Sequence, residues 1–189
     1  KWLHGMEVAN GGTYYPLAHQ WCLDKNLTLF GNSDIHIPSN FYRYTAGRHR
    51  TVTLVFAEQR SVESIREALI AGRTAVWLNN QIIGQQACLQ PLFEAAVTFA
   101  AEPVDSEGTF IVKINNTALI DLDLQKEGTT GPEHISIPAR SEISVLIHTD
   151  PEQEVANLSY QVRNFLIAPE KGLLIRIPLT EPALVVTAD

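Results

Sequence analysis

Residues 27–36 read LTLFGNSDIH, and this stretch decides how the first half of the chain is interpreted. The apolar run at its start is typical of a strand buried on both faces, and the polar residues that follow place Asp34 and His36 at the strand's C-terminal end. In an extended segment, residues two positions apart point to the same side, so these two side chains are predicted to project together. That end of a parallel strand is where α/β folds and barrels place their active sites.

The residue types at this strand end suit a metal ion. A carboxylate oxygen from Asp34 and an imidazole nitrogen from His36 form a ligand pair that fits zinc, manganese or iron better than calcium. The spacing alone leaves a second interpretation open, in which Asp34 is a cap or turn residue and His36 is a surface contact. The residues by themselves therefore predict either a metal site or a polar strand end.

The neighbouring sequence alternates between strand-like and helix-like patterns. Strands are predicted at 5–9, 27–34, 51–57 and 74–80, and helices at 16–26 and 61–73. The order strand, helix, strand predicts parallel pairing with right-handed crossovers, as in an α/β layer or barrel. Four strands and two helices are too few to close a barrel, so an open, apolar sheet edge is expected.

Both predicted helices carry an apolar face. In the helix at 61–73, Ser61 can cap the first turn and Gly72 can close the last one. Its apolar stripe is predicted to consist of Val62, Ile65, Ala68 and Leu69. In the helix at 16–26, Pro16 suits the first turn, and the predicted face consists of Leu17, Ala18, Trp21 and Cys22.

From about residue 92 the pattern changes to short segments in which apolar and polar residues alternate with a period of two. About seven or eight strands are predicted in this half, with inward residues such as Ile114, Leu122 and Ile147. This density of short strands is typical of an antiparallel, immunoglobulin-like β-sandwich. No Cys…Trp…Cys pattern accompanies it, so the prediction concerns architecture alone. The predicted domains are an α/β portion at 1–88 and a β-sandwich at 89–189.

Composition excludes several classes of partner. The chain has 189 residues, 45% of them hydrophobic, and a formal net charge of −7. Nucleic acid and anionic membrane surfaces attract clustered Lys and Arg, so the acidic net charge argues against either as the main partner. No apolar run approaches the length of a membrane span, and the first residues lack the apolar core of a signal peptide.

Cys22 and Cys88 show no spacing typical of a zinc site or a redox motif, and both are predicted to be buried. A single disulfide between them is the alternative that the sequence leaves open.

The segments GMEVANG (5–11), GNSDIHIP (31–38) and RHRTVTLVFAEQRSVESIREALIAGRTAVWLNN (48–80) together resemble the C-terminal portion of the PHP (polymerase and histidinol phosphatase) family of metal-dependent phosphoesterases. The likeness is to two-domain bacterial members, in which a distorted β/α barrel precedes a small β domain; YQVRNFLIAPEKGLLIRIPL (160–179) is similar to the latter. The resemblance implies that Asp34 and His36 are ligands of a cluster of two or three divalent metal ions. The cluster would activate water to hydrolyse a small phosphate ester.

The chain departs from the family pattern in one important way. The family's other ligands, an early H-x-H segment, a T-D-H segment and a middle glutamate and histidine, come before the S-D-x-H motif and are not found in these residues. His4 is expected to be a surface residue, and Glu7 is a candidate for touching the site. The chain is therefore expected to be the C-terminal part of such a hydrolase and inactive alone. Its expected partner is the missing N-terminal part of the same barrel, and relatives of this type favour a bacterial periplasmic location.

The segment 40–50, NFYRYTAGRHR, follows the metal motif directly and gathers basic side chains. In the intact enzyme, Arg43, Arg48, His49 and Arg50 are candidates for holding the substrate phosphate, because an arginine fork fits phosphate oxygens. The alternative is a solvated basic loop.

A different class of function is a binding or scaffold module whose sandwich engages a protein or carbohydrate. Such a module would need an exposed aromatic patch. The aromatic residues of the second half mostly occupy positions that indicate core. A third possibility, a hydrolase tail that has lost its activity, is not separable from the first on these residues.

Overall fold

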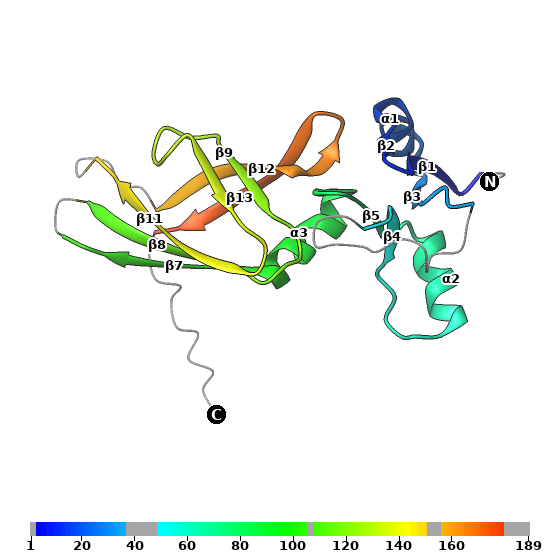
Figure 1. Cartoon of the computed structure of the whole chain (residues 1–189), viewed down its shortest axis with the longest axis horizontal. Coiled ribbons are helices and arrows are strands. Elements are labelled where there is room, and N and C mark those ends of the chain that lie inside the picture. The colour runs from blue at the N-terminus through cyan, green and yellow to red at the C-terminus, as the bar shows by residue number, and fades with distance from the viewer. Residues whose placement is uncertain (1–2, 37–48, 106–107, 151–155, 180–189) are drawn as a thin grey trace. The chain divides into compact units, whose positions relative to one another are not determined.

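The computed structural model describes residues 3–36, 49–105, 108–150 and 156–179, which form two compact units (Figure 1). The first unit comprises the described residues up to Glu94 together with Arg163–Leu173. The second comprises Ala95–Val162 and the described residues from Leu174 on. Residues 163–173 therefore belong to the first unit, although they come late in the sequence. The predicted division into 1–88 and 89–189 places them in the second domain. That contiguous division stays a prediction.

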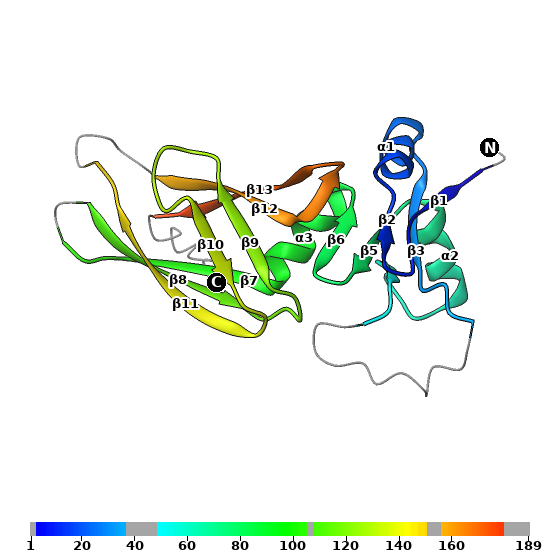
Figure 2. The ribbon, with the colours of Figure 1, turned by 45° about the horizontal axis from the view of Figure 1, so that its top comes forward.

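The first unit begins with a small sheet covered by one helix (Figure 2). Strands β1 (Gly5–Asn10) and β3 (Thr28–Asn32) pair in parallel, and the short strand β2 (Thr13–Tyr14) pairs antiparallel with the end of β1. Helix α1 (Pro16–Lys25) connects β2 to β3 and begins at a proline, whose missing N–H is not needed in a first turn. The chain leaves α1 through Asn26 in the left-handed region, with a φ of 49°. Strand, helix and parallel strand occur here in the predicted order.

The core of this unit includes residues from α1, from the small sheet and from later strands. Its buried members are Val8, Ala9, Cys22, Leu27, Leu29, Val76, Leu78, Ile83 and Leu166. The predicted face of α1 is wrong in part, because Leu17 and Trp21 are 83% and 55% exposed. Cys22 is buried as predicted, and His19, which was not predicted to face inward, is buried with it. His19 is completely buried, and its Nδ1 lies 2.7 Å from the hydroxyl oxygen of Tyr14, which gives this polar ring one partner inside the unit.

The next elements are β4 (Val52–Val55), α2 (Val62–Ile70), β5 (Thr74–Leu78) and β6 (Gln81–Gly84). The parallel pairing predicted for the strands on either side of α2 is wrong: β4 and β5 are antiparallel, as are β5 and β6. The Phe56 N–H donates to the Arg73 carbonyl, which extends the β4–β5 ladder by one more bond. Helix α2 is therefore inserted in the connection of a hairpin, and it does not cross over to a parallel strand.

The N-terminus of α2 forms as predicted, but its apolar stripe does not lie where the sequence places it. The Ser64 N–H donates to Oγ of Ser61 over 3.1 Å, so Ser61 is the N-cap. Of the predicted stripe only Ala68 is buried, while Val62 is 77% and Ile65 is 41% exposed. Leu69 is half-buried, so the buried side of the helix consists of Ala68 and part of Leu69 and is narrower than predicted.

Strand β3 is joined to the β4–β5 hairpin by threonine side chains. The Thr53 hydroxyl accepts from the Gly31 N–H and donates to the Gly31 carbonyl, both over 2.9 Å. The Thr74 hydroxyl donates to the Leu29 carbonyl over 2.8 Å. The approach is close enough that a Cβ on Gly31 would lie 2.2 Å from Cγ1 of Val76. Glycine is therefore required at this position by the packing of β3 against β5.

A third helix, α3 (Gln86–Ala96), was not predicted. It contains Pro91, which removes one intrahelical hydrogen bond. Packing compensates for this loss: Leu89 and Phe93 are buried, and the Phe93 ring meets the ring of Phe165 edge to face with centroids 5.8 Å apart.

The second unit consists of two antiparallel sheets, as expected for a β-sandwich. One has the order β11 (Ser141–His148), β8 (Thr109–Asn116), β7 (Val97–Pro103). The other begins with the order β10 (His134–Ile137), β9 (Leu122–Lys126), β12 (Asn157–Ala168), and β13 (Lys171–Pro178) also pairs with β12. The end of β12 belongs to the first unit, where it pairs in parallel with β6, so this sheet continues through β6, β5 and β4. The predicted alternation is observed, since Ile114, Leu122 and Ile147 are buried. Residues 180–189, where the last of the predicted strands would fall, lie outside the described residues.

The interior of this unit also contains buried polar groups with specific partners. The Asn116 amide donates to the Ile120 carbonyl over 2.9 Å and to the Pro138 carbonyl over 3.0 Å. The Tyr160 hydroxyl donates to the Pro132 carbonyl over 2.8 Å, and burial raises the pKa of Tyr160 to about 12. These bonds fix the turns between strands, because each satisfies a carbonyl that the sheets do not pair.

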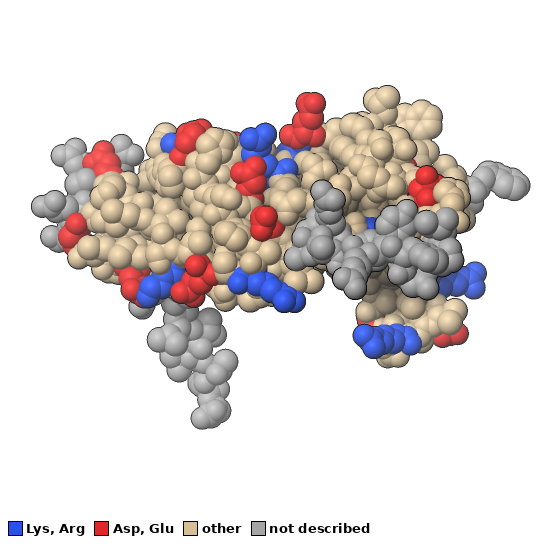
Figure 3. Space-filling view, viewed as in Figure 1, with Lys and Arg blue, Asp and Glu red and all other residues tan. Residues whose placement is uncertain are grey.

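No helix of the described residues is long and apolar enough to cross a membrane. On the face shown in Figure 3, basic and acidic side chains are interspersed. Cys22 is buried and Cys88 is half-buried, and both are free thiols. The disulfide that the sequence left open is therefore not formed.

Candidate metal centre

Polar side chains gather where the parallel strands β1 and β3 end. Asn10 and Asn32 are register partners across the two strands. The carboxylate of Glu7 accepts from the Asn10 amide over 2.9 Å and from the Asn32 amide over 2.6 Å. The Gly11 N–H also donates to the Asn32 carbonyl over 2.9 Å, so the backbone after β1 is fastened to the end of β3. Glu7, a candidate from the sequence, thus stands in a polar network that holds the two strand ends together.

The predicted ligand pair lies two to four residues beyond the end of β3. The Nε2 atom of His36 is 3.3 Å from Oδ1 of Asp34. Both side chains are open to solvent, at 84% exposure for His36 and 58% for Asp34. They therefore point toward one another, as the sequence predicted, and are not buried among apolar groups.

The physical reason for this contact differs from the predicted one. Strand β3 ends at Asn32, and Asp34 has a φ of 51°, in the left-handed region. Strand alternation therefore does not bring Asp34 and His36 together; a turn does, and aspartate tolerates that conformation better than most residues. A Cβ on Gly11 would lie 3.8 Å from Cβ of Asp34, so the turn that follows β1 passes beside the pair.

The donor atoms of the pair fit a divalent metal ion, but they are too few to complete a site. Zinc binds imidazole nitrogen and carboxylate oxygen at about 2.0–2.2 Å, so two ligands of one ion stand roughly 3–3.5 Å apart, which includes the observed spacing. Catalytic zinc sites use about three protein ligands. Within the described part of the chain, no group of three or more His, Cys, Asp or Glu side chains is placed to hold a metal ion. Any further ligands must come from elsewhere.

The predicted phosphate contacts are placed only in part. Arg43 and Arg48 lie outside the described residues. His49 is described, and its two ring nitrogens lie 2.6 Å from the Arg50 carbonyl oxygen and 3.1 Å from the Asn79 carbonyl oxygen. Its ring also lies against Trp77, with centroids 4.0 Å apart. His49 is thus tied to the β5–β6 turn, and Arg50 is half-buried beside it.

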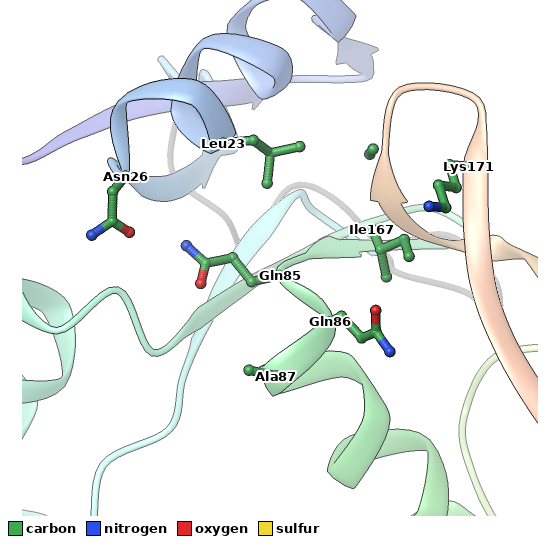
Figure 4. Close-up of a pocket in the computed structure, with 8 residues that line it drawn as sticks. Leu23, Asn26, Gln85, Gln86, Ala87, Ile167 and Lys171 are labelled. Atoms are coloured by element: carbon green, nitrogen blue, oxygen red, sulfur yellow. The ribbon is translucent and has the colours of Figure 1, made fainter.

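A separate cleft of about 400 Å³ opens elsewhere in the first unit (Figure 4). Side chains of Asn26, Gln85, Gln86 and Lys171 line it together with apolar residues. The described lining includes no carboxylate, imidazole or thiol, so it has no ligand suited to zinc, manganese or iron. The candidate ligands Asp34 and His36 do not line this cleft and are exposed on the surface after β3.

Three comparisons bear on these observations. A family model described as an Ig-like domain matches residues 97–178, which cover the strands of the second unit. No curated protein matches the chain. Among solved structures, the chain is similar to a two-domain protein from Bacteroides vulgatus that contains a predicted PHP-like metal-dependent phosphoesterase, with 38% sequence identity and a TM-score of 0.84.

That likeness covers 93% of this chain and 52% of the Bacteroides vulgatus protein, so the chain spans about half the length of this relative. The similarity extends across both units, since 93% of the chain exceeds either unit alone. The resemblance first indicated by Asp34, His36 and the sequence around them is thereby confirmed. The chain is thus similar over both units to this two-domain protein with a predicted PHP-like metal-dependent phosphoesterase, and residues 97–178 of its second unit match an Ig-like domain.

Proposed function

We propose that this chain corresponds to the C-terminal part of a PHP-like metal-dependent phosphoesterase, and that Asp34 and His36 are two of its metal ligands. The observation that carries the proposal is the 3.3 Å approach of His36 Nε2 to Asp34 Oδ1 at the end of a parallel strand. The Bacteroides vulgatus relative supports it, because its PHP-like domain is described as metal-dependent. In this proposal, the first unit is the end of a distorted β/α barrel and the boundary to the sandwich lies near residue 88.

When bound, a zinc, manganese or iron ion would act as a Lewis acid and would activate a water for the hydrolysis of a phosphate ester. The chain's own residues would act around it. Asp34 and His36 would hold the ion through one oxygen and one nitrogen, and the Glu7 network would keep the strand ends at a fixed separation. Arg43, Arg48, His49 and Arg50 remain predicted contacts for the phosphate oxygens of the substrate.

Catalysis by this chain alone is not expected. A two-ligand site leaves the ion loosely held, and the remaining ligands would belong to a part of the barrel outside residues 1–189. A periplasmic location in a bacterial cell belongs to the same proposal. A binding role for the sandwich is not favoured, because the large apolar residues exposed in its described part, such as Val104, Leu119 and Leu146, are aliphatic and form no aromatic patch.

Calorimetric titration of the full chain with Zn²⁺ and with Mn²⁺ tests the ligand assignment. We expect binding at one site, weakened at least about tenfold in Asp34→Asn and in His36→Gln, because each variant loses a metal-binding atom. His134→Gln, on an exposed position of β10, is the matched control and should leave the affinity unchanged. Equal affinities in all four proteins would show that the ion binds somewhere else. Hydrolysis of p-nitrophenyl phosphate by the chain alone would contradict the proposed division of the site.

A further inference from the structure

The turn between β1 and β2 contains a chemically reactive pair of residues. Asn10 is followed directly by Gly11, and this is the only Asn-Gly pair among the 189 residues. The strands pair at Asn10 and Thr13, so Gly11 and Gly12 form a two-residue hairpin loop. Gly11 has a φ of 58°, which glycine adopts without strain. The tight turn thus explains why a glycine follows Asn10.

An asparagine that precedes a glycine can lose its side-chain amide. The backbone nitrogen of the glycine gives up its proton and attacks Cγ of the asparagine, the bond from Cγ to Nδ2 breaks, and ammonia leaves. Water then opens the resulting succinimide ring at either carbonyl, which gives aspartate or isoaspartate. Glycine permits the attack most readily, because it has no side chain to obstruct the nitrogen. The reaction consumes water and involves no oxidation or reduction.

In the folded chain, both reacting groups are held by hydrogen bonds. The Gly11 N–H, which contains the attacking nitrogen, donates to the Asn32 carbonyl over 2.9 Å. The Asn10 amide, which contains the leaving group, donates to Oε2 of Glu7 over 2.9 Å. Glu7 is itself fixed, since its Oε1 accepts from the Asn32 amide over 2.6 Å. The attacking nitrogen and the leaving group are thus each bound to a partner other than one another.

The backbone around the pair is fixed as well. Asn10 has a register partner on each side, Thr13 in β2 and Asn32 in β3. Thr51 is buried, and its hydroxyl donates to the Gly11 carbonyl. Ring closure requires the nitrogen to turn toward Cγ of Asn10, and a backbone that is bonded on both sides resists this rotation. The reaction must therefore wait for a local opening of the strand ends.

We propose that Asn10 is a site of spontaneous deamidation, and that the bonds of the strand ends to Glu7 and Asn32 suppress the reaction in the folded chain. This inference does not rest on the proposed function.

Neither product fits the place of Asn10. An aspartate there sets a second carboxylate beside Glu7, where the amide now donates, and the two negative charges repel. An isoaspartate adds a methylene to the main chain, which disrupts the register with Thr13 and Asn32. Deamidation is therefore expected to open the polar network that joins β1 to β3.

Peptide mapping by mass spectrometry measures the reaction. The full chain is kept in a mildly alkaline buffer, either folded or in urea, and the deamidated fraction of each asparagine is followed over time. In urea, Asn10 should react faster than any other asparagine. In the folded chain its rate should be at least about tenfold lower than in urea. Equal rates in the two conditions would overturn the suppression, and another asparagine that reacts first in urea would overturn the assignment of the site.

The variant Glu7→Ala tests which contact suppresses the reaction. It removes the acceptor of the Asn10 amide, so deamidation of the folded variant should be at least about threefold faster, with no change in urea. Glu63→Ala, at an exposed position of α2, is the matched control and should react like the unmodified chain. An unchanged rate in Glu7→Ala that circular dichroism shows to be folded would contradict the role of Glu7.

A variant that carries the product supplies a second measurement, which does not require Glu7→Ala to fold. In Asn10→Asp, the Gly11 amide should exchange its hydrogen at least about tenfold faster than in the unmodified chain, because the strand ends open more often. Asn157→Asp, at the exposed start of β12, should leave this exchange unchanged. Slow exchange of Gly11 in Asn10→Asp would contradict the predicted opening of the network.

Discussion

His36 and Asp34 face one another across 3.3 Å, measured between Nε2 and Oδ1, in a turn that begins two residues after β3 ends. The left-handed backbone at Asp34 turns the chain so that both side chains are directed to the same patch of solvent. The adjacent turn after β1 is fastened to β3 through Gly11 and Asn32. The backbone geometry thus brings the two candidate ligands together.

The close packing of β3 on β5 predicts that Gly31→Ala destabilises the first unit. The new Cβ would lie 2.2 Å from Cγ1 of Val76 and 3.1 Å from Cγ2 of Thr51, so a strand must move. We expect a loss of about 1–3 kcal/mol in the free energy of unfolding, measured by urea denaturation. Gly12→Ala is the control, because a Cβ there has no neighbour within 4 Å. Equal losses in the two variants would show that β3 does not approach β5 this closely.

The burial of His19 predicts a loss of stability in acid. Burial lowers the pKa of His19 from 6.5 to about 4, so between these values the unfolded chain binds a proton that the folded chain does not. Stability from this group is therefore fully present above pH 6.5 and is lost as the pH falls toward 4. The loss should amount to about 2–3 kcal/mol, given about 1.4 kcal/mol for each pKa unit.

Thermal or urea unfolding at a series of pH values measures this effect. His19→Gln should show a shallower decline between pH 6.5 and 4 than the unmodified chain, whatever its stability at neutral pH. His4→Gln, at an exposed position of the same unit, should keep the full decline. An unchanged decline in His19→Gln would mean that His19 is accessible to protons in the folded chain.

The buried amide of Asn116 predicts a sensitive position in the second unit. It bonds the carbonyls of Ile120 and Pro138, and no water can take its place without opening the core. Asn116→Ala should lower the stability of the sandwich by about 1–3 kcal/mol, because buried carbonyls lose their donors. Asn115→Ala, at a half-buried neighbouring position on the same strand, should change the free energy of unfolding much less. Near-equal effects would contradict the role of the amide.

The sequence was most informative where local chemistry acts alone. Ser61 was predicted as an N-cap because its hydroxyl can accept from the first turn, and Ser64 donates to it as expected. The period-two residues of the second unit, such as Ile114 and Leu122, were predicted as core and are buried. Both signals depend on near neighbours in the chain, so a single sequence contains them.

The parts that could not be predicted depend on distant contacts. Periodicity gives the type of an element and not its direction, so the antiparallel pairing of β4 with β5 was missed. Packing decides which side of a helix is buried, and α2 uses Ala68 where the sequence favoured Val62. Helix α3 forms despite Pro91, because Phe93 packs on Phe165, about seventy residues further along the chain.

The candidate site shows the same division. The pairing of Asp34 with His36 was predicted from their spacing, but strand alternation was the wrong reason, since a left-handed turn produces the contact. The bonds from Asn10 and Asn32 to Glu7 were not predicted, because they require the register of two parallel strands. An asparagine at the end of each of two parallel strands is the signal that could have indicated them.

The position of a bound ion tests the central claim most directly. Crystals of the full chain grown with zinc, measured on both sides of the zinc absorption edge, would show where the metal lies by anomalous scattering. We expect a zinc peak within bonding distance of Oδ1 of Asp34 and Nε2 of His36. The peak should be absent in crystals of the double variant Asp34→Asn, His36→Gln. A zinc peak at other residues, with Asp34 and His36 bonded only to each other and to water, would contradict the central claim.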